Sequence, residues 1–211
     1  SLSARPETLF EPFAGSAAVT LSAASQNIAR AYRINDILLP LMEIWKQTLN
    51  APETLANRYE ALWNAQLGNE AACYNEIRSA FNEDQEPAKL LYLMARCVKN
   101  AIRFSKEGKF NQSPDHRRKG MHPSKMRTAL VASHSLLQGK TTCSSMDYAT
   151  FLEEATPNDI LYMDPPYQGT SRSADHRYVQ SLDLERFLHT LDHLNSRNIP
   201  FIVSFDGQCG T

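Results

Sequence analysis

The sequence predicts an α/β fold in which a doubly wound, mostly parallel sheet is interrupted by a mostly helical insertion. Strand, turn, helix and strand patterns follow one another from Thr8 to Ile34, as they do where doubly wound sheets begin. Strand and helix patterns alternate again from Thr141 to Phe205, whereas the segment between shows helical patterns and no convincing strand. With 211 residues, 42% of them hydrophobic, the chain is long enough to bury a core.

The first elements follow from local patterns. Thr8–Glu11 predicts a short strand that runs into a turn containing Gly15. Ala17–Gln26 is rich in Ala and Leu and predicts a helix, for which Ser16 is the expected cap. Ile28–Ile34 predicts the second strand. This order brings the glycine turn to the carboxyl end of the first strand.

The middle of the chain predicts several helices. The pattern is helical from residue 37 to residue 103, with breaks at Asn50–Pro52, near Gly68 and before Pro87. A polar loop follows, and Pro123–Gln138 predicts a further helix. These residues contain no strand pattern, so they are expected to stand apart from the sheet.

The last part of the chain predicts alternating strands and helices. In order they are strand Thr141–Ser145, helix Tyr148–Ala155, strand Asp159–Met163, helix Leu182–Ser196 and strand Ile199–Phe205. In the last helix, apolar residues recur at a spacing of three and four, which predicts a packing stripe of Leu184, Phe187, Leu188, Leu191 and Leu194. The continuous apolar run Phe201–Val203 is typical of an interior strand.

Two regions are therefore expected. Residues 1–37 and 139–211 form a discontinuous α/β core, and residues 38–138 form the helical insertion. The chain lacks an initiator Met and stops soon after its last predicted strand, so we expect the ends of the core to be missing.

The net charge of −1 hides a concentrated basic block. Residues 96–127 carry ten Lys and Arg against Glu107 and Asp115, a balance of +8, while the rest of the chain has a balance of −9. The ten are Arg96, Lys99, Arg103, Lys106, Lys109, Arg117, Arg118, Lys119, Lys125 and Arg127. Such a block is typical of a surface that contacts a polyanion, although a solvated charged loop gives the same pattern.

Composition excludes several classes of protein. No apolar run reaches the roughly 18 residues of a membrane span, and the first residues lack the apolar stretch of a signal peptide. The 4 Cys are scattered without a CxxC pair, which argues against a disulfide framework or a zinc site and fits a reducing cytoplasm.

The sharpest chemical signal is Asp164-Pro165-Pro166-Tyr167, directly after the apolar strand that ends at Met163. Ligands of open α/β sheets bind at the carboxyl ends of strands. The prolines fix the backbone and leave their carbonyls as acceptors, Asp164 adds a carboxylate, and Tyr167 adds a flat ring. Together they could hold a planar amino group on a stacked base. The alternative is a rigid turn that happens to contain Asp.

Two further positions suit a nucleotide-like ligand. Gly15 allows a ligand to approach the backbone closely, and the following helix presents free N–H groups. Asp36 ends the second predicted strand, where an acidic residue about 20 positions after the glycine turn typically accepts both ribose hydroxyls. A helix N-cap is the alternative role for Asp36, and a common glycine turn is the alternative for Gly15.

These motifs resemble those of the N6-adenine DNA methyltransferases. Asp164–Tyr167 resembles their catalytic motif, which amino-group methyltransferases share. Phe13, Ala14 and Gly15 resemble the start of their F-x-G-x-G loop for S-adenosylmethionine, with Ala17 in place of the second Gly. Asp147 and Tyr148 resemble the acidic–aromatic pair that meets the adenine ring of the cofactor, with an N-cap as the alternative role for Asp147. The long insertion between the motifs resembles the DNA adenine methylases whose target-recognition region lies there.

The resemblance implies a Rossmann-like core that transfers a methyl group from S-adenosylmethionine to N6 of a flipped-out adenine in duplex DNA, without a metal. Tyr167 would stack on the base while Asp164 and the Pro165 carbonyl orient its amino group. The expected partners are double-stranded DNA and, unless the enzyme stands alone, a cognate restriction endonuclease, in the cytoplasm of a bacterial-type cell at its nucleoid. The residues expected to contact DNA are Arg103, Lys109, Arg117, Arg118 and Lys119.

Two alternatives stay open. An RNA adenine-N6 methyltransferase would use the same chemistry, although the basic block lacks the dense aromatic residues of RNA readers. A non-catalytic DNA-binding module with a decayed methylase core is the other, because nothing before Leu9 resembles the amino-terminal cofactor segment of the family.

Overall fold

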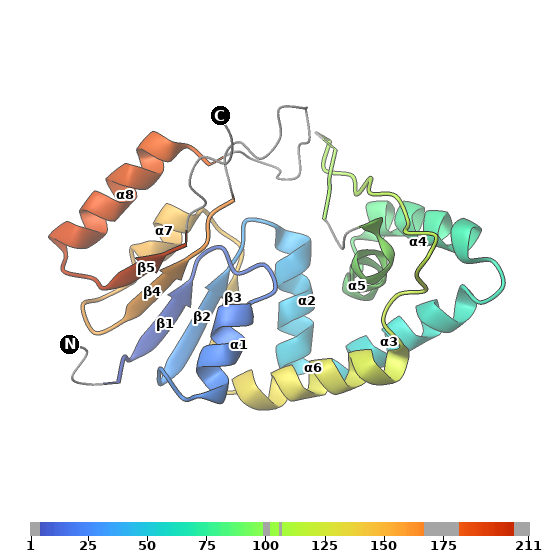
Figure 1. Cartoon of the computed structure of the whole chain (residues 1–211), viewed down its shortest axis with the longest axis horizontal. Helices are drawn as coiled ribbons and strands as arrows, with labels where there is room; N and C mark the ends of the chain where they lie inside the picture. The colour runs from blue at the N-terminus through green and yellow to red at the C-terminus, as the bar shows by residue number, and fades with distance from the viewer. Residues whose placement is uncertain (1–4, 99–101, 106, 167–181, 205–211) are drawn as a thin grey trace. The chain divides into compact units, whose positions relative to one another are not determined.

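The structure is a computed structural model that describes residues 5–98, 102–105, 107–166 and 182–204 (Figure 1). The strands are β1 (Thr8–Glu11), β2 (Ala31–Asn35), β3 (Thr141–Ser144), β4 (Ile160–Met163) and β5 (Phe201–Val203). The helices are α1 (Ala18–Ser25), α2 (Leu39–Asn50), α3 (Pro52–Ala65), α4 (Glu70–Asp84), α5 (Pro87–Arg96), α6 (Pro123–Leu137), α7 (Tyr148–Leu152) and α8 (Leu184–Ser196).

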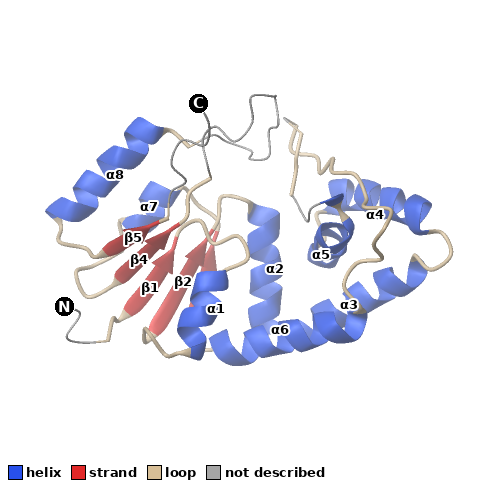
Figure 2. Cartoon of the chain, viewed as in Figure 1, coloured by secondary structure: helices blue, strands red, loops and turns tan. Residues whose placement is uncertain are grey.

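The five strands form one parallel sheet in the order β3-β2-β1-β4-β5, which confirms the predicted α/β fold (Figure 2). From β1 the chain first builds outward through β2 and β3, and then returns to add β4 and β5 on the other side of β1. The direction of winding therefore changes between β1 and β4. In open α/β sheets a crevice opens at this switch point, outside the carboxyl ends of the strands.

Helices cover both faces of the sheet, as alternating side chains of the strands require. Phe10, Leu161 and Met163 pack with buried residues of α7 and α8 on one face. On the other face, the Tyr32 hydroxyl donates to the carbonyl of Ala23 in α1 at 3.2 Å. A doubly wound sheet with two covered faces is the result.

The described residues divide into two compact units. The first includes the sheet and comprises residues up to Met42 and from Leu136 onward, and the second comprises Glu43–Ser135. The second unit is built around α3, α4 and α5, which begin where the sequence predicts breaks. Pro52 and Pro87 occupy the first turns of α3 and α5, where a missing N–H costs nothing.

Three local predictions were wrong at the level of single residues. Ser16 does not cap α1, because the N-cap is Ala17 and it makes no side-chain cap hydrogen bond. The second strand begins at Ala31 and not at Ile28, because Asn27 turns the chain with a φ of 53° and leaves Ile28 exposed. Helix α7 ends at Leu152, short of the predicted Ala155.

The apolar stripe of α8 is only partly a packing surface. Phe187 and Leu194 are buried against the sheet, but Leu184 and Leu188 are exposed. The final strand is also not interior, because β5 lies at one edge of the described sheet and Ile202 is 55% exposed. Hydrophobic spacing identified both elements correctly but overestimated how much of each is covered.

Candidate functional site

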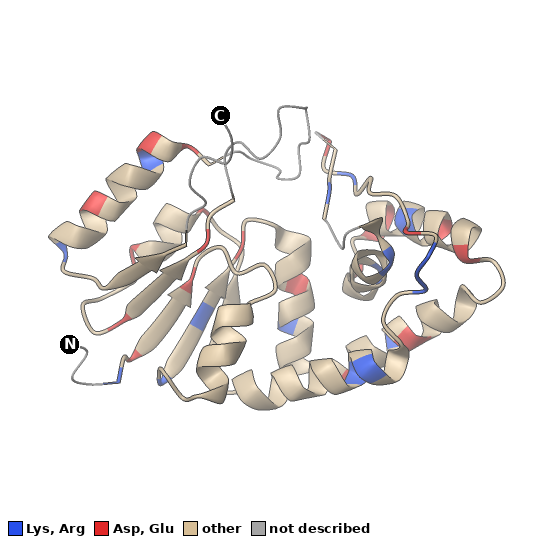
Figure 3. Ribbon diagram, viewed as in Figure 1, with Lys and Arg blue, Asp and Glu red and all other residues tan. Residues whose placement is uncertain are grey.

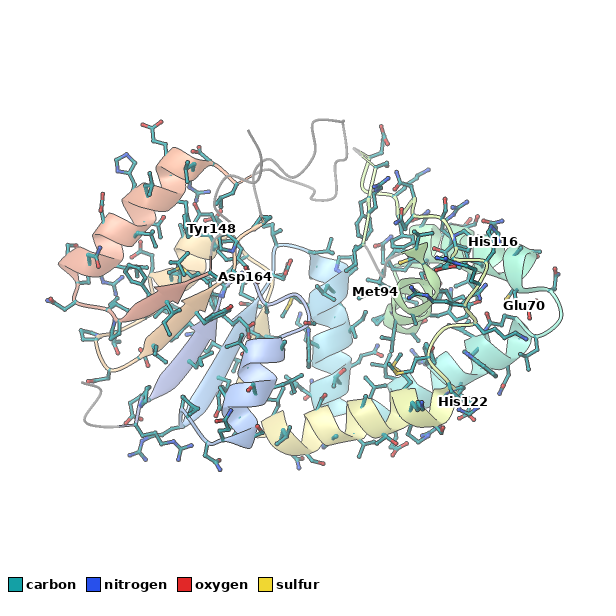
Figure 4. The ribbon with its side chains drawn as sticks, in the orientation of Figure 1. Glu70, Met94, His116, His122, Tyr148 and Asp164 are labelled. Atoms are coloured by element: carbon teal, nitrogen blue, oxygen red, sulfur yellow. The ribbon has the colours of Figure 1, made fainter. Side chains whose placement is uncertain are left out.

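The switch point brings the two main sequence motifs together. The glycine turn follows β1, and Asp164, Pro165 and Pro166 follow β4, its parallel neighbour. Phe13, Asp36 and Asp164 each follow the carboxyl end of one of the neighbouring parallel strands β1, β2 and β4. Figure 4 labels Asp164 in this part of the first unit. The order of strands therefore brings both motifs to one edge of the sheet.

Backbone hydrogen bonds fix the glycine turn against β2. The N–H of Ala14 donates to the Asn35 carbonyl at 2.8 Å, and the N–H of Gly15 donates to Asp36 Oδ2 at 3.1 Å. Gly15 has a φ of 50°, and a Cβ at this position would meet no heavy atom of the described residues within 4 Å. The turn therefore leaves room for a ligand beside its backbone.

Ala17 stands where the F-x-G-x-G loop that this turn resembles has its second Gly. The backbone of Ala17 is left-handed, with a φ of 48°. A Cβ in this conformation costs roughly 1–2 kcal/mol, whereas glycine adopts it without a steric penalty. The turn accepts this strain because Ala17 N–H donates to the Ala14 carbonyl and its own carbonyl starts the α1 ladder with Leu21.

We therefore expect Ala17→Gly to stabilise the protein by about 1 kcal/mol, measured as the free energy of unfolding in urea. Ala18→Gly is the matched control, since Ala18 is the exposed first residue of α1 and glycine should lower stability there. Equal destabilisation by both variants would contradict the role assigned to the backbone of Ala17.

Asp36 holds the start of the segment that leads into α2. Its Oδ2 accepts from the N–H of Gly15 and its Oδ1 accepts from the N–H of Leu38 at 3.0 Å. Burial raises the pKa of Asp36 above its ordinary value, although the Leu38 and Gly15 hydrogen bonds oppose this. Asp36 is not the N-cap of a helix that begins at Ile37, because α2 begins at Leu39 and the carboxylate instead closes a turn at Leu38. Contact of Asp36 with a ribose stays a prediction.

Glu11 is a member of this site that the sequence did not single out. It ends β1, is only 4% exposed, and its Oε2 accepts from both the N–H of Thr20 at 3.0 Å and the Thr20 hydroxyl at 2.5 Å. Burial raises the pKa of Glu11, the Thr20 hydrogen bonds lower it, and the charge of Asp164 raises it further. Three carboxylates, those of Glu11, Asp36 and Asp164, thus lie at the carboxyl ends of β1, β2 and β4.

The raised pKa of Glu11 has a consequence for stability. The folded protein holds this proton more tightly than the unfolded chain, whose carboxyl titrates near 4.5. The burial of Glu11 therefore costs stability as the pH rises from about 4.5 through the raised folded value.

We expect Glu11→Gln to gain stability relative to the parent protein across this pH window, because an amide keeps the acceptor for Thr20 without the buried charge. Urea unfolding of both proteins between pH 4.5 and pH 8 measures the difference. A difference that is constant with pH, or that shrinks as the pH rises, would contradict the buried carboxylate as its cause.

Asp147 and Tyr148 lie where β3 leads into α7. Asp147 caps α7 by accepting from the N–H groups of Ala149 and Thr150, so its alternative capping role is observed. Its two carboxylate oxygens also accept from the Arg186 guanidinium at 2.6 and 2.8 Å. Burial alone would raise the pKa of Asp147, but the hydrogen bonds from Arg186 and Thr150 lower it below its ordinary value.

Three aromatic rings gather beside this pair. The Tyr148 ring lies 5.1 Å from the Phe13 ring and 5.9 Å from the Phe187 ring, and Arg186 lies over Tyr148 at 5.3 Å. The glycine turn, β3–α7 and α8 therefore converge on one apolar wall with a fixed carboxylate at its edge. Sequence patterns missed Arg186, because nothing in one helix shows which carboxylate it faces.

Asp164 is exposed, Pro165 is buried and Pro166 is half-buried, so the rigid corner presents its carboxylate to solvent. Tyr167, the predicted stacking residue, lies outside the described residues. Within the described part of the chain, the site combines an acidic edge, an open glycine turn and an aromatic wall, a combination that suits a cationic, nucleoside-like ligand.

Comparison with known proteins identifies the family. The family model described as "D12 class N6 adenine-specific DNA methyltransferase" matches residues 2–208. The chain belongs to this family. The motifs that carried the resemblance, the glycine turn and Asp164–Tyr167, are both within the matched range.

Curated relatives agree with this assignment. A DNA N-6-adenine-methyltransferase of Escherichia phage P1 is 27% identical over 76% of this chain, which corresponds to 21% of the relative. The Retron Ec67 DNA adenine methylase of Escherichia coli is 26% identical over 93% of this chain and 67% of its own length. The type II methyltransferase M.FokI of Planomicrobium okeanokoites is 25% identical over 94% of this chain and 31% of its own length. The chain thus spans only part of each relative.

The basic block of residues 96–127 lies in the second unit. Figure 3 shows Lys and Arg along the loop that precedes α6. Arg103 and Lys109 directly precede Phe104 and Phe110, which form an antiparallel bridge. Arg117, Arg118 and Lys119 are all exposed.

These cations have acidic neighbours in the same unit. Asp115 lies 3.2 Å from both Arg117 and Arg118, and Glu70 lies 3.1 Å from Lys119. The charges of Arg117, Arg118 and Lys119 are therefore partly neutralised by these carboxylates.

Among the described residues, no group of three or more His, Cys, Asp and Glu is arranged to hold a metal ion. No helix in the same residues is long and apolar enough to cross a membrane.

Proposed function

We propose that this chain is the catalytic part of a site-specific DNA methyltransferase that methylates N6 of adenine in duplex DNA. The observation that carries the proposal is the meeting of the glycine turn and the Asp164–Pro166 corner on either side of the switch point. A donor bound at the first and an acceptor bound at the second would face one another with little further movement.

S-adenosylmethionine fits the residues of the first half of the site, and family membership implies its use. When bound, it supplies a methyl group on a positively charged sulfur. Asp36 would accept the ribose hydroxyls, Phe13 and Ala14 with Gly15 would border the ligand, and Asp147 with Tyr148 would meet its adenine. The negative charges of Glu11, Asp36 and Asp164 favour a cationic ligand at this edge.

The second half of the site would hold the target base. Asp164 and the carbonyl of Pro165 accept the two hydrogens of the adenine N6 amino group, which draws its lone pair out of conjugation. This lone pair would then accept the methyl group that bound S-adenosylmethionine supplies, and the sulfur would keep the electrons of its former bond to carbon. The exposed Asp164 carboxylate hands the released proton to solvent. Tyr167 would stack on the base, which must be flipped out of the duplex.

Duplex DNA is the proposed partner of the second unit. Arg103, Lys109, Arg117, Arg118 and Lys119 would neutralise phosphates, and the remainder of the unit would read base edges. A cognate restriction endonuclease is a proposed functional partner, because the relative M.FokI is named as a type II methyltransferase. The proposed activity takes place in the cytoplasm, at the nucleoid.

The test is a competition between polymers for transfer of a tritiated methyl group by the full-length protein. Duplex DNA and RNA that contain the same adenine sequences are mixed at equal concentration, and N6-methyladenine is counted in each. We expect label in duplex DNA. Label chiefly in RNA would replace the proposal by the RNA alternative, and failure to bind S-adenosylmethionine by calorimetry would favour the non-catalytic module.

A further inference from the structure

The loop between residue 111 and α6 carries three exposed cations of the second unit, Arg117, Arg118 and Lys119. We call residues 112–122 the basic loop. Its backbone carbonyls accept hydrogen bonds from side chains of α3, α4 and α5 and from the residue that follows α3. The acceptor–donor pairs are the Gln112 carbonyl with Tyr74 at 2.9 Å, the Arg118 carbonyl with Arg96, the Lys119 carbonyl with Gln66 at 2.9 Å, and the Met121 carbonyl with Tyr59 at 2.6 Å.

The donors form one buried polar cluster beneath the loop. Gln66 and Tyr92 have no exposed surface and Arg96 is 2% exposed. The Tyr92 hydroxyl donates to Gln66 Oε1 at 2.9 Å, which leaves the Gln66 amide nitrogen directed at the Lys119 carbonyl. Burial raises the pKa of Tyr92 to about 12, and burial also raises the pKa of Tyr59. The phenol protons are therefore present at any physiological pH.

The loop packs closely on this cluster. Gly120 has a φ of 84°, and a Cβ there would lie 3.3 Å from the Arg96 side chain and 3.4 Å from the Tyr59 hydroxyl. A side chain at this position would therefore crowd Arg96 in addition to the strain of the left-handed backbone. The path of the backbone between Arg118 and Met121 is thus defined by hydrogen bonds and by packing.

The other side of the loop is exposed and charged. Figure 4 labels Glu70 at the start of α4 and His116 and His122 in the loop. Arg117 and Arg118 share the carboxylate of Asp115, which is itself buried and whose pKa is lowered by the hydrogen bonds from Arg117. The backbone of the loop is therefore held by buried donors, while its cationic side chains lie on the exposed side.

We propose that the buried donors hold the basic loop as a preformed binding face for the phosphate backbone of duplex DNA, with Gln66 as its main positioning residue. The inference rests on the proposed function, because it assigns a mechanism to the DNA contact. A loop that is already ordered loses little conformational freedom on binding, so its cations can contact phosphates at lower cost. Gln66 acts through the Lys119 backbone and does not itself contact DNA.

The salt dependence of duplex binding tests this assignment in the full-length protein. Log affinity falls as log salt rises, and each lost phosphate contact makes this fall less steep by about 0.9. At 0.1 M salt, relative to 1 M, one lost contact corresponds to about an eight-fold loss of affinity. We expect Lys119→Gln to show this loss, and Gln66→Met to show a loss of similar size. The double variant should lose little beyond either single variant, because both remove the same contact.

Two further variants keep the test decisive. Tyr59→Phe removes only a hydroxyl and releases the Met121 carbonyl, so it should lower the slope in the same direction even where Gln66→Met fails to fold. Tyr32→Phe is the matched control, since its buried hydroxyl also donates to backbone carbonyls but lies on β2 in the first unit. We expect the control to leave the slope unchanged.

The outcomes separate this inference from the proposed function. Absence of salt-dependent duplex binding by the parent protein overturns the proposed function. Duplex binding by the parent with an unchanged slope in folded Tyr59→Phe and Gln66→Met overturns the positioning role alone. The positioning role is also overturned if the affinity losses of Gln66→Met and Lys119→Gln add in the double variant. Additive losses would mean that Gln66 affects binding independently of Lys119.

Discussion

Asp164→Ala is expected to lower the rate of methyl transfer by at least about 100-fold while leaving DNA binding in place. Removal of one preorganised hydrogen-bonding group from a polar transition state typically costs about 10²–10³ in rate. Asp164 is exposed, so its loss removes no buried packing. Single-turnover transfer of a tritiated methyl group to duplex DNA measures the rate, and a gel-shift titration measures binding.

The control for this variant is Asp192→Ala, which removes an equally exposed carboxylate from α8. The control should transfer methyl groups at the parent rate. Asp164→Asn should be less impaired than Asp164→Ala, because its amide oxygen can still accept from the target amino group. Parent-like transfer by Asp164→Ala would remove this residue from the reaction.

Asp36→Ala is expected to weaken binding of S-adenosylmethionine by roughly 10- to 100-fold. Hydrogen bonds to a charged group contribute about 1.5–3 kcal/mol each, and the variant removes the proposed ribose acceptor. It also leaves the N–H groups of Gly15 and Leu38 without their carboxylate, which loosens the turn. Calorimetric titration with S-adenosylhomocysteine measures the affinity without turnover.

Asp159→Ala is the matched control for Asp36. Its carboxylate also holds its own turn, by accepting from the N–H of Thr156 at 2.8 Å and its hydroxyl at 2.7 Å, but it precedes β4 at the opposite end of the sheet. We expect the control to lose stability and to keep cofactor affinity. An Asp36→Ala protein that binds the cofactor as tightly as the parent would show that Asp36 serves only to hold the turn between Gly15 and Leu38.

The fold was predictable because the spacing of apolar residues and the positions of prolines mark its strands and helices. The apolar run before Asp164 identified β4, and the prolines at positions 52 and 87 marked helix starts, since proline is tolerated only where no N–H is needed. Ser16 was misleading because capping depends on backbone conformation, and here Ala17 turns left-handed while Glu11 binds the first turn of α1.

The site was only partly predictable for a similar reason. Gly15, Asp36 and Asp164 each follow a strand, so the order of elements alone brings them to one edge of the sheet. Glu11 and Arg186 became visible only through their tertiary partners, Thr20 and Asp147. Contacts between residues far apart in the chain leave no local pattern, and this also hid the cluster around Gln66.

The central claim is that the Asp164 corner and the glycine turn form one site for methyl transfer to adenine. Its most direct test is to express the complete gene in a methylase-free host and sequence the DNA for N6-methyladenine. We predict methylated adenines within one defined sequence for the parent protein and none for Asp164→Ala. Folded, expressed parent protein that leaves every adenine unmodified, or equal methylation by both proteins, would contradict the claim.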